Sequence, residues 1–285
     1  MWFSADKQAS LVGWVMAAGG LGALAAAKPL AWGLNFVSWR EICVGLAVLT
    51  LITALVIFFV VPEKPSTSMG AGGIRAQLSG VKDVLRSRHF WRYAPMGFWF
   101  TGGFMAVQGL WASRWMSVIE GLDASQIADR LGWLSLAMLG GFLFMGFFAG
   151  RLVRRGISLD TLYRLAMSVS IVDLAVLSLN PGIGEGWLWA ILGACFSLSN
   201  ICYGLVAQAF PSTHSGRANT AANLFIFLGA FGLQWGIGVL TDLLQAHDWQ
   251  ARDAYQVVFW LLVLGQILAL VWLFASKPKT VSTVG

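Results

Sequence analysis

Long apolar windows follow one another along this chain, and none shows the two-residue alternation of a membrane-barrel strand. A helix needs about 20 apolar residues to cross the hydrocarbon core of a bilayer. Because lipid offers no hydrogen-bond partners, a spanning segment must also satisfy its own backbone, as a helix does. We therefore predict an all-α, polytopic membrane helix bundle with about eight transmembrane helices. The predicted spans are Ala9–Leu30, Cys43–Val61, Pro95–Ser113, Leu131–Gly150, Leu162–Leu179, Trp187–Phe210, Asn219–Thr241 and Gln256–Ala275.

The first window has a second interpretation. Lys7, the apolar stretch after it and the alanines at 25–27 resemble a secretory signal peptide with its cleavage site. Asp6 weakens the basic start, and the apolar stretch is longer than a signal peptide requires. The window therefore favours a membrane span.

Composition supports a membrane location. Hydrophobic residues make up 58% of the 285 residues and charged residues 11%, whereas a soluble domain carries about 25% charged residues. No basic segment accompanies a nucleic-acid-binding motif, so we expect no nucleic acid among the partners. His89, His214 and His247 lie far apart, without catalytic or metal-ligand spacing, and no nucleotide motif is present. The sequence therefore predicts no enzyme activity, no catalytic residue, no cofactor and no metal.

Basic residues predict the orientation. When the eight spans are threaded with the N-terminus inside, fourteen of the 19 Lys and Arg residues fall on the inner side. Cytoplasmic loops carry such an excess, and here the bias alternates from loop to loop. We therefore predict that both termini are cytoplasmic, and we expect the lipid bilayer as the first partner.

The longest predicted loop divides the chain into three parts. It covers residues 62–93 and begins with a linker rich in Ser and Gly. Its second half places apolar residues, among them Ile74 and Val81, at helical spacing between basic residues. This pattern is typical of a helix that lies on the cytoplasmic membrane face. We expect residues 1–61 to form a two-helix unit and residues 94–285 a six-helix bundle.

Three local motifs resemble sequences of one transporter family, the major facilitator superfamily. Residues 146–156 are similar to the second copy of its glycine and arginine loop signature, but the acidic residue of the stronger copy is absent. Residues 211–220 resemble the matching turn before the seventh span in bacterial members. Residues 108–112, in the third span, resemble the sequence found in one bacterial branch of the family. The residues that carry the two cytoplasmic loop motifs are Gly150, Arg151, Arg154, Arg155, Gly156, Gly216 and Arg217.

The resemblance implies a fold and a function. The family has twelve helices in two six-helix bundles, and this chain resembles helices five to twelve, so residues 1–61 would be a remnant of the N-terminal bundle. A secondary transporter of a small solute is implied, in the inner (cytoplasmic) membrane of a bacterium, working by alternating access. We expect the first four family helices to be missing and the chain alone not to transport. The alternative is a non-transporting membrane scaffold or subunit, which would form a stable complex and carry no solute flux.

Polar residues in the third span are candidates for solute binding, because polar side chains in a membrane helix face a cavity or another helix. Trp111 lies one turn beyond Gln108, and the resemblance places this helix at the central cavity. We expect Gln108 to hydrogen-bond the solute and Trp111 to stack on it; the alternative is helix packing. Arg114, near the outer end, either attracts an anionic solute or extends to the membrane interface.

The sixth and seventh spans each mix amides with small residues on one face. The resemblance places both helices at the cavity, so we expect four of these residues to bind the solute: Asn200, Tyr203, Asn223 and Gln234. The alternative is close helix packing aided by amide hydrogen bonds. The full faces comprise Gly193, Ser197, Asn200 and Gly204 with Tyr203 adjacent, and Asn223, Phe227, Ala230 and Gln234.

Two pairs of glycines four residues apart predict close helix approach. They are Gly146 with Gly150, and Gly232 with Gly236. We expect them to be packing points and not binding sites.

Asp173 is the only carboxylate deep inside a predicted span. An ionisable residue within the membrane indicates function, and we expect Asp173 to be a proton-coupling site with the proton as coupling ion. The resemblance places this span on the outside of the bundle, and there the acid would instead bond to a neighbouring helix.

Overall fold

The computed structural model describes residues 18–22, 24–26, 28–61, 81–179, 186–208, 210 and 212–276. These residues form helices and no strand, which confirms the predicted all-α class. The helical elements, with η marking π-helical turns, are α2 (Lys28–Gly33), α3 (Trp39–Val60), α5 (Arg88–Met96), η1 (Gly97–Gly102), α6 (Gly103–Ala106), η2 (Val107–Trp111), α7 (Ala112–Val118), α8 (Ala124–Arg154), α9 (Leu159–Leu179), α10 (Gly186–Ser199), α11 (Ile201–Ala207), α12 (Ser212–Ala246) and α13 (Ala251–Ala275).

Six helical stretches in the described part of the chain are long and apolar enough to cross a membrane. Each coincides with one of the predicted windows. The third window lies within residues 88–118, where short α and π segments follow one another without a break. Half of the first window lies outside the described residues. The membrane-spanning stretches are Trp39–Val60, Ala124–Phe148, Leu159–Leu179, Gly186–Ala207, Gly216–Ala246 and Ala251–Ala275.

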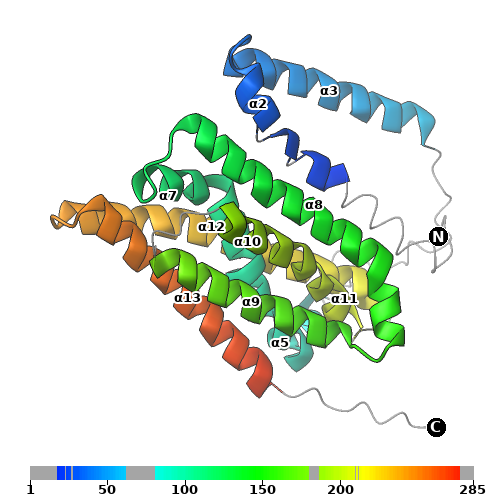
Figure 1. The fold of residues 1–285 in the computed structure, drawn as a ribbon. Helices are drawn as coiled ribbons and strands as arrows, with labels where there is room; N and C mark the ends of the chain where they lie inside the picture. Colours follow the sequence, from blue (N-terminus) through cyan, green and yellow to red (C-terminus); the bar gives the residue numbers. More distant parts are fainter. Residues whose placement is uncertain are drawn as a thin grey trace, which may run out of the picture.

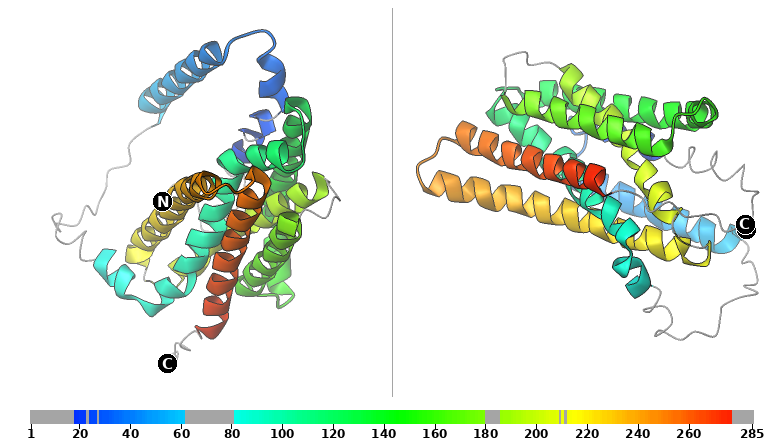
Figure 2. Two further views of the ribbon diagram at one scale, coloured as in Figure 1. Left: turned by 90° about the vertical axis from the view of Figure 1, so that its left-hand side faces the viewer. Right: turned by 90° about the horizontal axis from the view of Figure 1, so that it is seen from below.

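Two layers make up the main bundle (Figures 1 and 2). α8, α9 and α10 form one layer and α12 and α13 the other, and the segment 88–118 passes between them. Large aromatic side chains fill the space where this segment meets its neighbours. Phe104 stacks on Phe196 of α10 with ring centroids 4.0 Å apart, and Trp115 packs on Phe259 of α13 at 4.3 Å. The segment 88–118 is therefore the core of the bundle, although it is the least regular of the long helices.

Short capping motifs begin two of the long helices. Ser38 accepts a hydrogen bond from the backbone of Glu41, whose carboxylate in turn accepts one from the Ser38 backbone. Asp123 and Gln126 form the same reciprocal pair at the start of α8. Such a pair satisfies backbone N–H groups that have no partner in the helix. Residues next to each helix start therefore determine where α3 and α8 begin.

α3 stands apart from the bundle (Figure 1), and none of its residues is buried. Its side chains are apolar almost all round, which suits a helix surrounded by lipid or by other helices. The short helix α2 before it lies against α8.

Charged residues gather where the helices end. We call the two ends of the bundle the Glu120 end and the Asp160 end, because these residues lie before and after the 31-residue helix α8. At the first, Glu120 pairs with Arg130 at 3.2 Å and accepts a hydrogen bond from the Trp189 indole at 3.2 Å. One carboxylate thus ties together the segment after α7, α8 and α10.

Glycines let the helices approach closely, but they are not the glycines that the sequence predicts. Among the described residues, a Cβ atom on Gly146 or Gly236 would meet nothing within 4 Å, and one on Gly232 would only just reach the Phe98 ring, at 4.0 Å. The close approach is between α12 and η1, where a Cβ on Gly229 would lie 2.9 Å from the Phe98 Cα and one on Gly102 would lie 2.6 Å from the Ile226 carbonyl. The spacing of glycines along one helix does not report which helix faces them.

Replacing Gly229 by alanine should destabilise the protein, because the Phe98 backbone cannot move as a side chain can. We expect a cost of about 1–3 kcal/mol, typical of overpacking, seen as a lower midpoint of thermal unfolding in detergent. Gly236→Ala on the same helix is the matched control and should cause no loss. Equal losses in the two variants would contradict this packing.

Candidate functional site

Two of the long helices are interrupted, and several predicted site residues lie at the interruptions. The segment 88–118 contains the π turns η1 and η2, and α10 is separated from α11 at Asn200. Pro95 and the glycines of η1 explain the first irregularity, since π turns and kinks form where the regular ladder is broken. Non-helical or distorted backbone at membrane depth is tolerated where it lines a cavity or is buried in protein.

Side-chain hydrogen bonds join the segment 88–118 to two neighbouring helices. The Gln266 amide of α13 donates a hydrogen bond to the Trp99 carbonyl within η1, at 3.3 Å. The Trp111 indole, at the end of η2, donates to the Gln234 carbonyl of α12 at 2.9 Å. Both bonds give backbone carbonyls of membrane helices an additional partner.

Trp111 and Gln234, both predicted site residues, are therefore in contact. The acceptor is the Gln234 backbone carbonyl, so this bond does not involve the Gln234 side chain, which is half-buried. The Trp111 ring is 9% exposed and lies 5.9 Å from the Tyr255 ring. Gln108 is half-buried one turn before Trp111, and Arg114 is exposed.

Tyr203 and Asn223 form a second contact between predicted residues. The Tyr203 hydroxyl of α11 donates to the Asn223 side-chain oxygen of α12 at 2.7 Å. Tyr203 is half-buried and Asn223 is exposed. Asn200 lies at the helix interruption one turn before Tyr203 and is half-buried. The predicted residues of the sixth and seventh spans thus meet at one place on the α11–α12 boundary.

The predicted polar face of the sixth span divides into two parts. A Cβ on Gly193 would lie 3.1 Å from the Leu134 carbonyl carbon, and one on Gly141 would lie 2.8 Å from the Ser197 Cβ. Gly193 and Ser197 therefore serve close packing against α8. A Cβ on Gly204 would meet nothing within 4 Å in the described part of the chain, so there the face beyond Asn200 is not packed on another helix.

Asp173 lies within α9 and is 5% exposed. Among the described residues, neither of its carboxylate oxygens has a hydrogen-bond partner. A hydrogen bond to a neighbouring helix, the alternative that the sequence left open, is therefore not formed in the described part of the chain. A buried polar group without a partner in the described part of the chain is costly to keep, so Asp173 stands out from the packing residues of α9.

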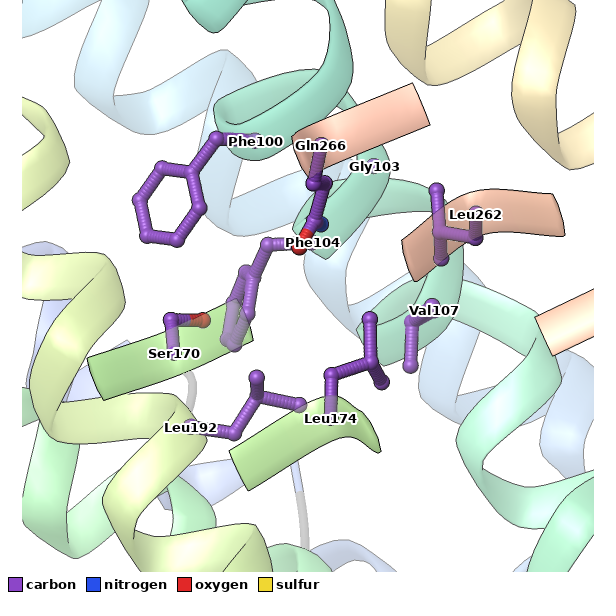
Figure 3. A pocket seen from close by; sticks show the side chains of 9 residues that line it. All are labelled: Phe100, Gly103, Phe104, Val107, Ser170, Leu174, Leu192, Leu262 and Gln266. Atoms are coloured by element: carbon purple, nitrogen blue, oxygen red, sulfur yellow. The ribbon is translucent and has the colours of Figure 1, made fainter. Parts of the chain in front are cut away.

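A small cavity lies close to the first interruption (Figure 3) and was not anticipated from the sequence. Its volume is about 10 Å³, which is about the space that one water molecule needs. Ser170 and Gln266 each bring to it a buried oxygen that has no partner among the described residues. The residues that line the cavity are Phe100, Gly103, Phe104, Val107, Ser170, Leu174, Leu192, Leu262 and Gln266.

The loop motifs occupy the Asp160 end. Arg151 and Arg154 lie in the last turn of α8, and Arg155 follows it; all three are exposed. Gly156 has a backbone φ of +87°, a left-handed conformation that glycine adopts at helix ends. Gly150 also lies inside α8.

The second predicted loop motif is placed differently. Gly216 and Arg217 lie in the first turns of α12, which begins at Ser212, and not in a turn before the helix. The helix thus begins four residues before Gly216.

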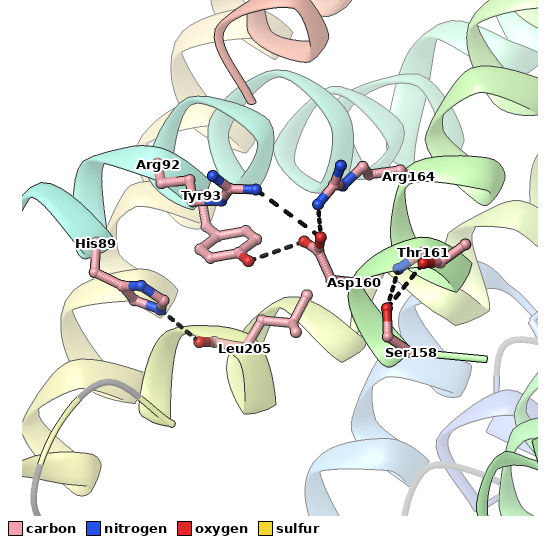
Figure 4. A network of polar contacts seen from close by, with 8 residues as sticks. All are labelled: His89, Arg92, Tyr93, Ser158, Asp160, Thr161, Arg164 and Leu205. Atoms are coloured by element: carbon pink, nitrogen blue, oxygen red, sulfur yellow. Dashed lines mark hydrogen bonds and ion pairs between the residues drawn. The ribbon is translucent and has the colours of Figure 1, made fainter. Parts of the chain in front are cut away.

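An ionic network at the Asp160 end was also missed (Figure 4). Asp160 accepts a hydrogen bond from the Tyr93 hydroxyl at 2.9 Å and pairs with Arg92 and Arg164. The motif lacks an acidic residue near Gly150, but a carboxylate of the next helix is present at this end. Tyr93 and Asp160 are 67 residues apart, so no local pattern could pair them.

The contact between Tyr203 and Asn223 can be measured by a double-mutant cycle of unfolding in detergent. Tyr203→Phe and Asn223→Ala should show a coupling free energy of about 0.6 kcal/mol, the average for such bonds in membrane proteins. Tyr255→Phe alters a tyrosine on another helix of the bundle, α13. Its coupling free energy with Asn223→Ala should be smaller than the experimental error. A coupling near zero for Tyr203 would contradict the contact.

In the described part of the chain, no three His, Cys, Asp or Glu residues are grouped as a metal site would require. No curated protein matches this sequence. A family model, the Major Facilitator Superfamily, matches residues 1–233, more than four-fifths of the 285 residues. The chain, with its apolar helices of membrane-spanning length, therefore belongs to the major facilitator superfamily of membrane transporters.

Proposed function

We propose that this protein is a secondary active transporter that moves a small solute across the membrane by alternating access. The proposal rests on one observation: polar side chains lie where the helices are interrupted. Gln108 and Trp111 lie at η2, and Asn200 and Tyr203 lie where α10 gives way to α11. Transporters bind their solutes near the middle of the membrane at discontinuous helices.

The proposed site takes its polar groups from three helices. Gln108 supplies an amide and Trp111 an aromatic face from the segment 88–118. Asn200, Tyr203, Asn223 and Gln234 supply amides and a hydroxyl from α11 and α12, and Arg114 gives positive charge at the Glu120 end. Such a set favours a neutral or anionic polar solute. We propose that these groups form one wall of the site and that a facing six-helix bundle supplies the other.

We further propose the three-part organisation and the orientation given above: a two-helix unit at 1–61, a linker at 62–93 and a bundle at 94–285, with both termini in the cytoplasm of a bacterium and the protein in its inner membrane. In the linker, only residues from 81 on are described. Val84 is fully buried there against the bundle, which supports a helix that packs on the cytoplasmic end of the bundle.

Gln108→Ala should abolish most uptake of the solute by vesicles that contain the protein in a full twelve-helix context. Losing one hydrogen bond to a bound polar group costs about 1–3 kcal/mol, which corresponds to a loss of affinity of about fivefold to 140-fold. Screening of radiolabelled solutes against the unaltered protein comes first.

Trp133→Phe is the matched control, because Trp133 is 58% exposed on α8 and belongs to no proposed contact with the solute. Its uptake should be unchanged. Equal uptake by Gln108→Ala and the unaltered protein would remove Gln108 from the site. A protein that forms a stable complex with another membrane chain and carries no solute at all would support the scaffold instead.

We propose that Asp173 couples transport to the proton. Its carboxyl is buried, lacks a partner among the described residues, and lies three residues from Ser170 at the cavity. A neutral acid in this position can take up and release a proton as the protein changes state.

Asp173→Asn keeps the size and neutrality of the protonated acid and removes its titration. The variant should still exchange solute across the membrane but should lose accumulation driven by a proton gradient. The measurement is uptake with an imposed pH difference, beside exchange at equal pH. Undiminished accumulation would exclude this role for Asp173.

A further inference from the structure

The network at the Asp160 end holds more positive than negative charge. Asp160 is one carboxylate shared by two guanidinium groups, those of Arg92 and Arg164. Arg92 is 4% exposed, and its nearest approach to Asp160 is 3.9 Å, which is an ion pair but too long for a hydrogen bond. The Arg92 Nε and Nη1 and the Arg164 Nε have no partner in the described part of the chain. One positive charge is therefore left over.

This charge is not confined to the interior. The Arg164 side chain is 29% exposed, and its guanidinium carbon lies 5.4 Å from the centre of the Phe274 ring at the end of α13. Arg164 makes the closer contact to Asp160, so the net positive charge belongs to the cluster of Arg92, Asp160 and Arg164 as a whole. Arg164 is the arginine of this cluster that reaches the outside of the bundle, between α9 and α13, two helices that pack on each other. Arg92 lies behind Asp160 and strengthens the positive potential there.

Exposed aromatic side chains also lie at this end of α13 and on the neighbouring α5. The Trp272 indole donates to the Trp91 carbonyl at 2.7 Å, so α13 and α5 meet here. Trp91 is 40% exposed, Trp272 50% and Phe274 53%. Tryptophan and arginine at the same height on a membrane protein mark the level of the lipid headgroups.

Apolar side chains continue from this level along both helices. Leu165 and Val172 on α9 and Leu268 and Val271 on α13 are each about three-fifths exposed. They offer acyl chains exposed apolar surface on the two helices that carry Arg164 and Phe274. A free anion would use the guanidinium groups alone, whereas a phospholipid would use both features.

We propose that the Asp160 end carries a binding site for an anionic phospholipid, with the lipid phosphate on the Arg164 guanidinium and the acyl chains along α9 and α13. The phosphate matches the guanidinium in charge and geometry. It also supplies the negative charge that Asp160 alone does not. The site is separate from the proposed solute site and does not depend on transport.

The test uses the full chain, purified in a neutral detergent, with phosphatidylglycerol or phosphatidylcholine added in mixed micelles. Thermal unfolding is followed as lipid is titrated, and bound lipid is counted by native mass spectrometry. Phosphatidylglycerol should raise the unfolding midpoint and remain bound, and phosphatidylcholine should do neither at the same concentration. Inorganic phosphate, the third arm, should have no effect.

Arg164→Gln should raise the half-saturating concentration of phosphatidylglycerol at least tenfold. Arg155→Gln is the matched control, because it removes the same charge at the same end from an exposed residue outside the network, and it should bind as the unaltered protein does. Arg164→Lys keeps the charge but loses the forked geometry, and it should bind with intermediate strength.

Several outcomes would overturn the proposal. Equal stabilisation by the two lipids would show that charge is not recognised, and an equal effect of inorganic phosphate would assign the site to a free anion. Equal weakening by Arg164→Gln and Arg155→Gln would show that only the general charge matters. If Arg164→Gln does not fold, undiminished lipid binding by Arg164→Lys would equally exclude forked recognition at Arg164.

Discussion

Hydrocarbon cannot hydrogen-bond, and this constraint governs the whole molecule. Each polar group that enters the membrane must find its partner within the protein, at a cost of several kcal/mol if it does not. Most backbone groups meet the requirement inside regular helices. Where the segment 88–118 departs from the regular ladder, side-chain hydrogen bonds join it to its neighbours. Gln266 of α13 bonds to the Trp99 carbonyl of the segment, and Trp111 of the segment bonds to the Gln234 carbonyl of α12.

The same constraint sorts the charges. The two ionic networks lie at opposite ends of the bundle, around Glu120 and around Asp160. Each uses one carboxylate to join helices that are distant in sequence. Between them lie a lone acid, Asp173, and a few amides and hydroxyls. Polar groups at this depth are costly to keep, and their concentration at the helix interruptions is the reason for placing the solute site there.

Much of the fold could be predicted from the sequence because a membrane span can be recognised from its apolar composition. Windows of apolar residues located the helices, and the Ser38–Glu41 and Asp123–Gln126 pairs mark two starts through local chemistry alone. The π turns could not be predicted. Pro95 and its neighbouring glycines permit a distortion, but its form depends on the α12 backbone that reaches Gly102.

The candidate site, too, could be predicted only in part. Residue type and resemblance singled out Trp111, Tyr203 and Asn223, but only the packing of helices shows that Trp111 bonds to α12 and Tyr203 to Asn223. Gln266 and Ser170 were within reach of the sequence, being polar residues inside predicted spans. Asp160 was not, because its partners Arg92 and Tyr93 are brought to it by the tertiary fold.

If Gln108 belongs to a solute site, water must reach it within the membrane, whereas the exposed face of α9 must lie in lipid. A membrane-impermeant thiol reagent distinguishes the two in a protein whose own Cys43, Cys195 and Cys202 have been replaced by serine. The account predicts that Gln108→Cys is labelled in intact membranes, while Val172→Cys, which is 63% exposed on α9, is not. Labelling of Val172→Cys with none of Gln108→Cys would contradict it.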